Sequence, residues 1–298
     1  MIYLLLCILS NLLIFIVFRL YPKLKINTIQ AIVMNYFFCV ITGLLFYSST
    51  LNQYIRQVDR FPSWGYMAIF LSFAFILSFM IMARTTQKLG ITVATIASKL
   101  SLVIPVAFSI LFFTGGSSNF SVPYYIGLAF ALVAIVLASL QPKDHNLKSF
   151  WTDRRILILP LSVFLLGGMQ DTLINWANLM FIPSGEYAVF VTFIFILALI
   201  WGILWLIKKQ EKFQAMSIVG GLMLGIPNFF SMIFLLRSLE AYDNNGALIY
   251  PLINIGIILG GALISVTIFK DKLMPINYLG VFLALVSLIL ISWANGYG

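Results

Sequence analysis

The chain is a succession of long apolar segments separated by short polar ones. Ten stretches reach the roughly 20 apolar residues that a helix needs to cross the hydrocarbon core of a bilayer. They cover approximately residues 1–20, 28–47, 63–83, 90–113, 122–140, 156–179, 187–207, 216–236, 246–269 and 275–294. The first lacks the basic start and the cleavage site of a secretory signal, so we expect it to be a span. The longest connecting segments, 48–62 and 141–155, are too short to hold a soluble domain.

The composition agrees with a protein that lies almost entirely within a membrane. Of 298 residues, 62% are hydrophobic and 9% charged, and the mean hydropathy is +1.05. Soluble domains carry about 25% charged residues. A net charge of +9 would suggest nucleic acid in a soluble chain, but here the basic residues lie in short loops. We therefore expect a multi-pass protein of the bacterial inner (cytoplasmic) membrane, with the lipid bilayer around it and no nucleic-acid partner.

The basic residues are distributed unevenly between the loops. The odd-numbered loops carry 14, namely Arg19, Lys23, Lys25, Arg84, Lys88, Lys143, Lys148, Arg154, Arg155, Lys208, Lys209, Lys212, Lys270 and Lys272. The even-numbered loops carry 3, namely Arg56, Arg60 and Arg237. Because basic loops stay in the cytoplasm, this asymmetry predicts cytoplasmic odd loops and both termini outside.

The ten stretches read as two copies of a five-span unit. Residues 90–114 overlay 246–270 in hydropathy, and the 13 residues from Gly127 resemble those from Gly280. The expected division is a first repeat over 1–140, a linker over 141–155 and a second repeat over 156–298. An odd number of spans per copy inverts the second repeat, which is a recurring transporter design. The fold class we predict is all-α integral membrane, with ten transmembrane helices as two inverted five-helix repeats.

The paired segments share a face of small residues. These are Gly127, Ala131 and Ala134 in one copy and Gly280, Ala284 and Ser287 in the other. Small faces let helix backbones approach closely. They predict either ordinary helix packing within the chain or a homodimer contact, so the protein is expected to be a monomer or a homodimer.

Three blocks of this sequence resemble the drug/metabolite transporter superfamily, in particular its EamA-type members with ten spans. The blocks are residues 82–113, residues 124–139 and residues 266–292. Each half of such proteins has a proline in its fourth span and an acidic residue in the turn that follows. Pro105 fits the proline and Asp271 roughly fits the acidic turn, whereas the first half has Gly115 and Gly116 there.

The resemblance implies a central cavity surrounded by spans one to four and six to nine, with spans five and ten outside it. Many members of the family keep both termini in the cytoplasm. The loop charges of this chain predict the reverse, and we follow the charges.

Lys99 is the candidate that the rest of the chain is organised around. It lies nine residues into the span over 90–113, about 13 Å along a helix with a rise of 1.5 Å per residue. A charge near the middle of a membrane costs roughly 2.5–3.5 kcal/mol on insertion scales, so it marks a functional site. Lys99 is expected to anchor an anionic substrate group or to cycle a proton. The alternatives are a structural ion pair and a snorkelling side chain.

The sixth span holds the candidate counter-charge. Asp171 lies in the most polar transmembrane stretch, on one helical face with Asn175 and Asn178. It is expected to pair with Lys99 across the cavity; the alternative is a structural pair or a group near the outer end. Glu186 at the head of span seven is expected either to cap that helix or to act as a gate.

Several uncharged side chains complete the predicted substrate site. Asn254 overlays Ser98, the neighbour of Lys99, and lies between Pro251 and Gly256, which can open a helix. Asn254 and Asn175 are expected to orient the substrate. Asn35 and Asn228 are weaker candidates, and Tyr250 and Trp176 are candidates whose aromatic rings equally suit packing or lipid contact. Trp64 and Trp293, near span ends, suit the interfacial belts.

Catalytic motifs do not occur in the sequence. It has no HExxH, G-x-S-x-G or P-loop pattern, and neither Cys7, Cys39 nor His145 belongs to a metal-binding pattern. We therefore expect no enzyme activity, no cofactor and no metal.

We predict a secondary transporter that moves a small polar anionic or zwitterionic metabolite by alternating access, driven by a proton gradient or by exchange. The alternatives are an exporter of hydrophobic cations bound by Asp171 and, in another class, a non-transporting membrane enzyme or scaffold.

Overall fold

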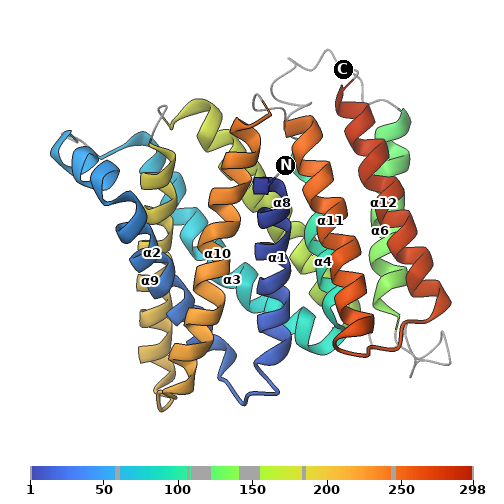
Figure 1. Ribbon diagram of the computed structural model, residues 1–298, viewed down its shortest axis with the longest axis horizontal. Coiled ribbons are helices and arrows are strands. Elements are labelled where there is room, and N and C mark those ends of the chain that lie inside the picture. Colours follow the sequence, from blue (N-terminus) through green and yellow to red (C-terminus); the bar gives the residue numbers. More distant parts are fainter. Residues whose placement is uncertain are drawn as a thin grey trace. The chain divides into compact units, whose positions relative to one another are not determined.

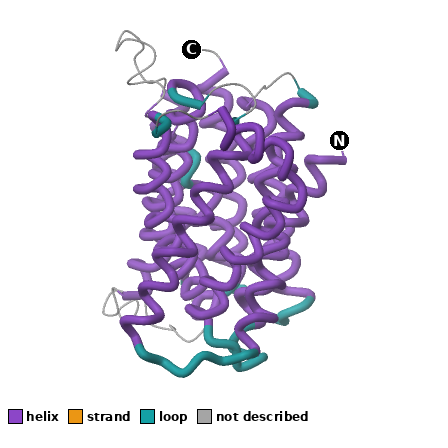
Figure 2. The backbone as a smooth tube through the Cα atoms, turned by 90° about the vertical axis from the view of Figure 1, so that its left-hand side faces the viewer, coloured by secondary structure: helices purple, strands orange, loops and turns teal. Residues whose placement is uncertain are grey.

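The structure is a computed structural model that describes residues 2–57, 61–105, 108, 122–140, 155–182, 186–242 and 246–296. In these ranges the regular secondary structure is helical and no strand occurs (Figure 2). The predicted all-α class is confirmed.

Each predicted apolar stretch contains a helix, although the helix in the stretch 90–113 ends at Leu100. The ten helices of the described ranges are α1 (Ile2–Leu20), α2 (Thr28–Gln57), α3 (Ser63–Leu89), α4 (Ile91–Leu100), α6 (Val122–Ser139), α8 (Arg155–Met180), α9 (Tyr187–Lys209), α10 (Met216–Glu240), α11 (Gly246–Thr267) and α12 (Pro275–Gly296). Seven are long and apolar enough to cross a membrane: α1, α2, α3, α8, α9, α10 and α12. The protein is therefore an all-helical, multi-pass membrane protein.

The segment predicted to be the second loop is largely helical. Helix α2 continues to Gln57 across a kink at Tyr47, whose backbone has φ −124° and ψ 21°. Thirty residues of helix measure about 45 Å, which exceeds the roughly 30 Å of a hydrocarbon core. The kink changes the direction of the last ten residues, and Figure 1 shows that segment turning away from the first part of α2.

The span predicted over 90–113 is interrupted directly after Lys99. Helix α4 ends at Leu100, and Ser101 and Leu102 form a turn before helical residues resume at Val103. Pro105 has no N–H to donate to the carbonyl four residues earlier. Instead the Ile104 N–H donates to the Ser101 carbonyl at 3.0 Å, and the Ser101 hydroxyl donates to the Ser98 carbonyl at 2.6 Å. The proline therefore breaks the helix one turn before itself.

The opening suggested in the second copy is absent. Helix α11 runs from Gly246 to Thr267 without a break, so Pro251 and Gly256 do not open it. Gly256 serves packing, because a Cβ there would lie 2.5 Å from Ile8 Cδ1 of α1.

The chain forms two compact units. Unit 1 comprises Met1–Arg19, Ile81–Met169 and Ser231–Gly298, and unit 2 comprises Leu20–Met80 and Gln170–Phe230. Helices α3, α8 and α10 contribute to both. Both units draw on both halves of the sequence, so the inverted-repeat division stays a prediction.

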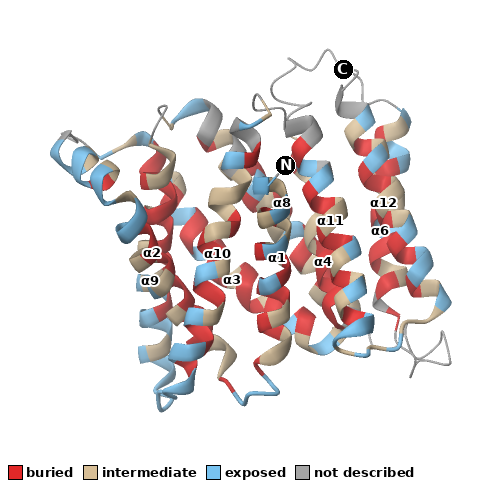
Figure 3. Cartoon of the chain, in the orientation of Figure 1, coloured by how far each residue is buried: buried red, intermediate tan, exposed pale blue. Residues whose placement is uncertain are grey.

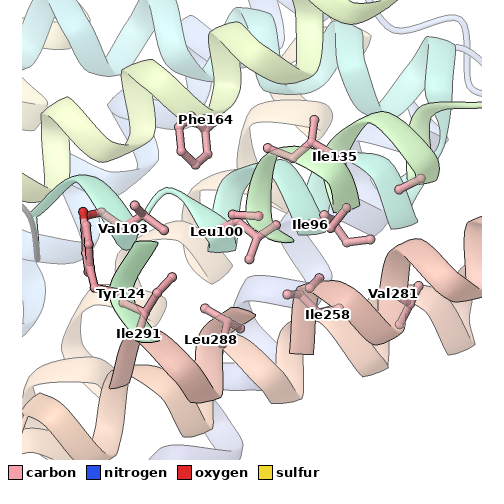
Figure 4. Packing of buried hydrophobic residues seen from close by; sticks show 14 residues of the cluster. Ile96, Leu100, Val103, Tyr124, Ile135, Phe164, Ile258, Val281, Leu288 and Ile291 are labelled. Carbon is pink, nitrogen blue, oxygen red and sulfur yellow. The ribbon is translucent and has the colours of Figure 1, made fainter. Parts of the chain in front are cut away.

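The core of unit 1 lies where α4, α6, α8, α11 and α12 meet. Its buried side chains include Ile96 and Leu100 of α4, Ile258 of α11 and Leu288 of α12 (Figure 4). Figure 1 shows α6 and α12 side by side, and the small-residue faces predicted from the sequence lie between them. Ser287 Oγ donates to the Gly127 carbonyl at 2.7 Å. These faces are used for packing within the chain.

The contact between α6 and α12 supports a stability prediction. At Gly280 a Cβ would lie 2.8 Å from the Ala138 backbone nitrogen and 3.1 Å from the Ala134 carbonyl oxygen. Because these atoms belong to backbone, they cannot rotate away. We expect Gly280→Val to destabilise the protein by about 1–3 kcal/mol, as overpacking does, and to lower its melting temperature. The control is Leu279→Val, at an exposed position of α12; equal melting temperatures for the two variants would contradict the close approach.

An ion pair joins three segments of unit 1. Arg19, at the end of α1, donates to Asp271 Oδ1 at 2.8 Å and to the carbonyls of Thr86 and Gln87 at 3.2 and 2.9 Å. Asp271 Oδ2 accepts from Ser265 Oγ at 2.6 Å. Asp271, the acidic residue that the family resemblance suggested for this turn, is thus the ion-pair partner of Arg19.

At one end of unit 2, Gln30 and Tyr21 form hydrogen bonds with residues at or near the start of α10. Gln30 Oε1 accepts from the Gln214 N–H at 2.8 Å and Ser217 Oγ at 3.2 Å, near the start of α10. Tyr21 donates its hydroxyl to the Gly220 carbonyl at 2.8 Å. Burial raises the pKa of Tyr21, so its phenol keeps the proton that it donates.

Candidate functional site

Lys99 lies in a group of polar side chains from three helices of unit 1. Its Nζ donates to Asn11 Oδ1 of α1 at 3.0 Å. Asn254 of α11 is 8% exposed and donates its Nδ2 to the Lys99 carbonyl at 3.4 Å. The structure thus brings together two predicted site residues, Lys99 and Asn254. We call Asn11, Lys99 and Asn254 the lysine cluster.

Asn11 was not predicted from the sequence. Its Nδ2 donates to the Cys7 carbonyl at 2.9 Å, which leaves Oδ1 directed at the Lys99 ammonium. The signal that could have identified it is its place as the one asparagine in the apolar stretch 1–20. An amide within a span needs a polar partner, but the sequence does not identify that partner.

Glycine positions explain why the three helices approach closely. Gly260 of α11 faces Leu12 of α1, and a Cβ there would lie 2.5 Å from Leu12 Cδ1. Gly261 faces Thr95 of α4, with 2.7 Å between a Cβ and Thr95 Cγ2. Helix α11 therefore lies close to both α1 and α4, one or two turns from Asn254.

Lys99 lies near the end of α4, a largely buried helix. Its residues from Ile91 to Ala97 are all buried (Figure 3). The helix begins after Gly90, whose φ of 95° favours glycine. The break after Leu100 then places Lys99 in the last turn of a buried helix rather than in the middle of a continuous span. A side chain held in this way by a hydrogen bond suits recognition of an anionic group.

Asn35 and Asn228, the two weaker candidates, meet in unit 2. Asn228 Nδ2 of α10 donates to Asn35 Oδ1 of α2 at 3.2 Å, and Cys39 Sγ lies 3.5 Å from the same Nδ2. Asn35 is fully buried, and its Nδ2 has no hydrogen-bond partner among the described residues. These asparagines form a second polar group, separate from the lysine cluster in the chain's division into units.

The remaining substrate-binding candidates lie on α8 and α11. Asp171 is exposed on α8 in unit 2, so its pairing with Lys99 of unit 1 stays a prediction. Trp176 is half-buried, with its ring 6.1 Å from that of Phe181. Tyr250 of α11 is 36% exposed. The side chain of Asn175 lies outside the described residues.

Glu186 does not cap α9 with its side chain. It occupies the residue before that helix, but its carboxylate accepts from Trp64 Nε1 at 3.2 Å and makes no capping hydrogen bond. Trp64 is only 2% exposed, so the expectation that it lies in an interfacial belt is wrong. Its ring packs edge-on against Phe190 and Phe193 of α9, which removes it from lipid. Trp293 is 54% exposed.

Within the described residues, no group of three His, Cys, Asp or Glu side chains is placed to hold a metal ion.

Comparisons with known proteins place the chain only coarsely. No protein-family model matches it. The chain is similar to an uncharacterized protein of Haemophilus influenzae, with 26% identity over 263 residues that cover 87% of this chain and 84% of the relative. The fold and the site together define the class as an all-helical, multi-pass membrane protein with buried polar groups between its helices.

Proposed function

We propose that the protein is a secondary transporter of a small polar metabolite that is anionic or zwitterionic. The observation that carries the proposal is the lysine cluster: Lys99, within an apolar helical unit, is hydrogen-bonded to Asn11 and lies beside Asn254. Ionisable groups in membrane segments are costly and mark substrate or proton pathways. Lys99 would bind the anionic group, and the two amides would orient the remaining polar atoms.

The proposed architecture is ten spans in two inverted repeats, with alternating access between two related packings. The ten helices and the interrupted α4 support it, because discontinuous helices near the middle of the membrane are a recurring way to build transporter sites. The sequence blocks that resemble EamA-type members of the drug/metabolite transporter superfamily favour the same architecture. The loop charges favour cytoplasmic odd loops.

The test is solute flux through purified protein in liposomes. Counterflow of labelled amino acids and small carboxylates would be compared for wild type, Lys99→Met and Lys209→Met, the last an exposed lysine at the end of α9. We expect wild type and Lys209→Met to carry at least one such solute. Lys99→Met should lose about 100-fold in flux, since removing one partner of a hydrogen-bonded charge pair, here the pair of the ammonium with an anionic substrate, costs roughly 2–5 kcal/mol of binding.

The same assay separates the alternatives. Equal flux through wild type and Lys99→Met would show that the lysine cluster is structural. Absence of any flux, with the protein folded, would favour the non-transporting enzyme or scaffold. Flux restricted to hydrophobic cations would favour the exporter alternative, with Asp171 as its carboxylate.

A further inference from the structure

Unit 2 contains a cavity that the proposed function does not use. Its volume is about 410 Å³, and it lies between the end of α2, the start of α3 and the first turns of α9. Its lining residues are Leu51, Tyr54, Ile55, Phe61, Pro62, Trp64, Val189, Thr192, Phe193 and Ile196. We call it the aromatic cavity.

Four aromatic rings form a continuous part of its wall. The ring of Trp64 lies 5.9 Å from that of Tyr54 and 5.6 Å from that of Phe193. The Phe61 ring follows at 6.5 Å from Phe193. The faces of such rings carry negative charge density and attract cations.

A carboxylate lies at the edge of this wall. Glu186 Oε2 accepts the hydrogen bond of Trp64 Nε1, which fixes the carboxylate beside the cavity. No basic side chain among the described residues lies within ion-pairing distance of it. A partly buried carboxylate is stabilised by a cation beside it, so a cationic ligand would complement Glu186.

The kink in α2 explains why the cavity exists. Beyond Tyr47, the last ten residues of α2 place Leu51, Tyr54 and Ile55 on the cavity and the polar Asn52, Gln53 and Arg56 away from it. If α2 were straight, this apolar face would not lie beside the start of α3 and the first turns of α9. The segment that the sequence suggested to be a loop is therefore a wall of the cavity.

We propose that the aromatic cavity binds an organic ammonium compound with an apolar or aromatic body. Its ammonium group would lie beside the Glu186 carboxylate, which Trp64 holds in place, and the ring of Tyr54, and its body would fill the apolar space beside Phe193. Ligand pockets of this kind combine mostly apolar walls with a few polar groups that fix orientation. This inference is independent of the lysine cluster and stands or falls without it.

The test compares two probes of nearly equal shape on the full chain in lipid nanodiscs. Phenethylammonium carries the charge, and 2-phenylethanol is its neutral counterpart; calorimetry measures both dissociation constants. We expect wild type to bind the cation about tenfold more tightly or better, since a desolvated cation gains from both carboxylate and rings. Glu186→Gln should remove this difference while 2-phenylethanol binds as before. Glu211→Gln, an exposed glutamate of the same unit, is the matched control and should behave as wild type.

Equal affinity for the two probes in wild type would overturn the proposal, and so would unchanged cation affinity in Glu186→Gln or no binding of either probe. Should Glu186→Gln fail to fold, Trp64→Leu decides: loss of the cation's advantage supports the site, and its retention contradicts it. Lys99→Met should bind phenethylammonium like wild type. A failure of transport in that variant is thereby distinguishable from a failure of the aromatic cavity.

Discussion

Asn11→Leu should destabilise the protein, and Lys99→Met added to it should restore stability. The single substitution removes the Oδ1 atom that accepts the Lys99 hydrogen bond at 3.0 Å and places an apolar side chain against the ammonium. Loss of a buried acceptor costs about 1–3 kcal/mol, and more for a charged group. Lys99→Met alone should cost less than Asn11→Leu, because it leaves a neutral amide oxygen, rather than a charged group, without its partner.

The measurement is the melting temperature of wild type, both single variants and the double variant in the same lipid. A non-additive cycle, with the double variant near wild type, is the expected result. Lys99→Met should therefore melt closer to wild type than Asn11→Leu does and yet lose flux, which is the behaviour of a residue kept for function. If Lys99→Met melts as low as Asn11→Leu and keeps its flux, its role is structural.

Arg19→Gln should open one end of unit 1. The guanidinium contacts Asp271 and two backbone carbonyls of α3, and the side chains of Arg19 and Asp271 are 23% and 21% exposed. Removing it leaves a partly buried carboxylate and two carbonyls short of a donor. We expect a loss of about 2–3 kcal/mol, less than for a fully buried pair because water still reaches this one.

The melting temperatures of Arg19→Gln, Asp271→Asn and the double variant measure this effect. The double variant should lose less than the sum of the two single losses, because the pair contributes as a unit. Lys25→Gln, an exposed loop residue of the same predicted side, is the control and should change little. Full additivity would show that the two side chains do not stabilise each other.

The helices were predictable because the apolar runs and their polar separators are unambiguous. The start of α3 at Ser63 and the start of α12 at Pro275 follow directly from this pattern. The extension of α2 was not, since Ser48, Ser49 and Asn52 are residues that suit a loop. The apolar side chains of that segment, Leu51, Tyr54 and Ile55, lie on one helical face that lines the aromatic cavity.

The charged residue of the site could be predicted from the sequence, whereas most of its contacts could not. Lys99 stood out because a lysine within a span is rare, and Asn254 followed from its overlay on the neighbour of Lys99. Asn11 did not stand out, since an isolated amide carries no indication of its partner. Trp64 was misplaced for a related reason: position near a helix end does not reveal that Phe190 and Phe193 cover the ring.

The interruption of α4 has an electrostatic consequence for Lys99. A helix carries about half a negative charge at its C-terminal end, where the last carbonyls have no helical donors. Because α4 ends at Leu100, this end lies at the residue that bears the ammonium. A continuous helix would have cancelled these peptide dipoles along its length. The break before Pro105 thus leaves the negative end of a helix dipole at Lys99, where it stabilises the ammonium within an apolar unit.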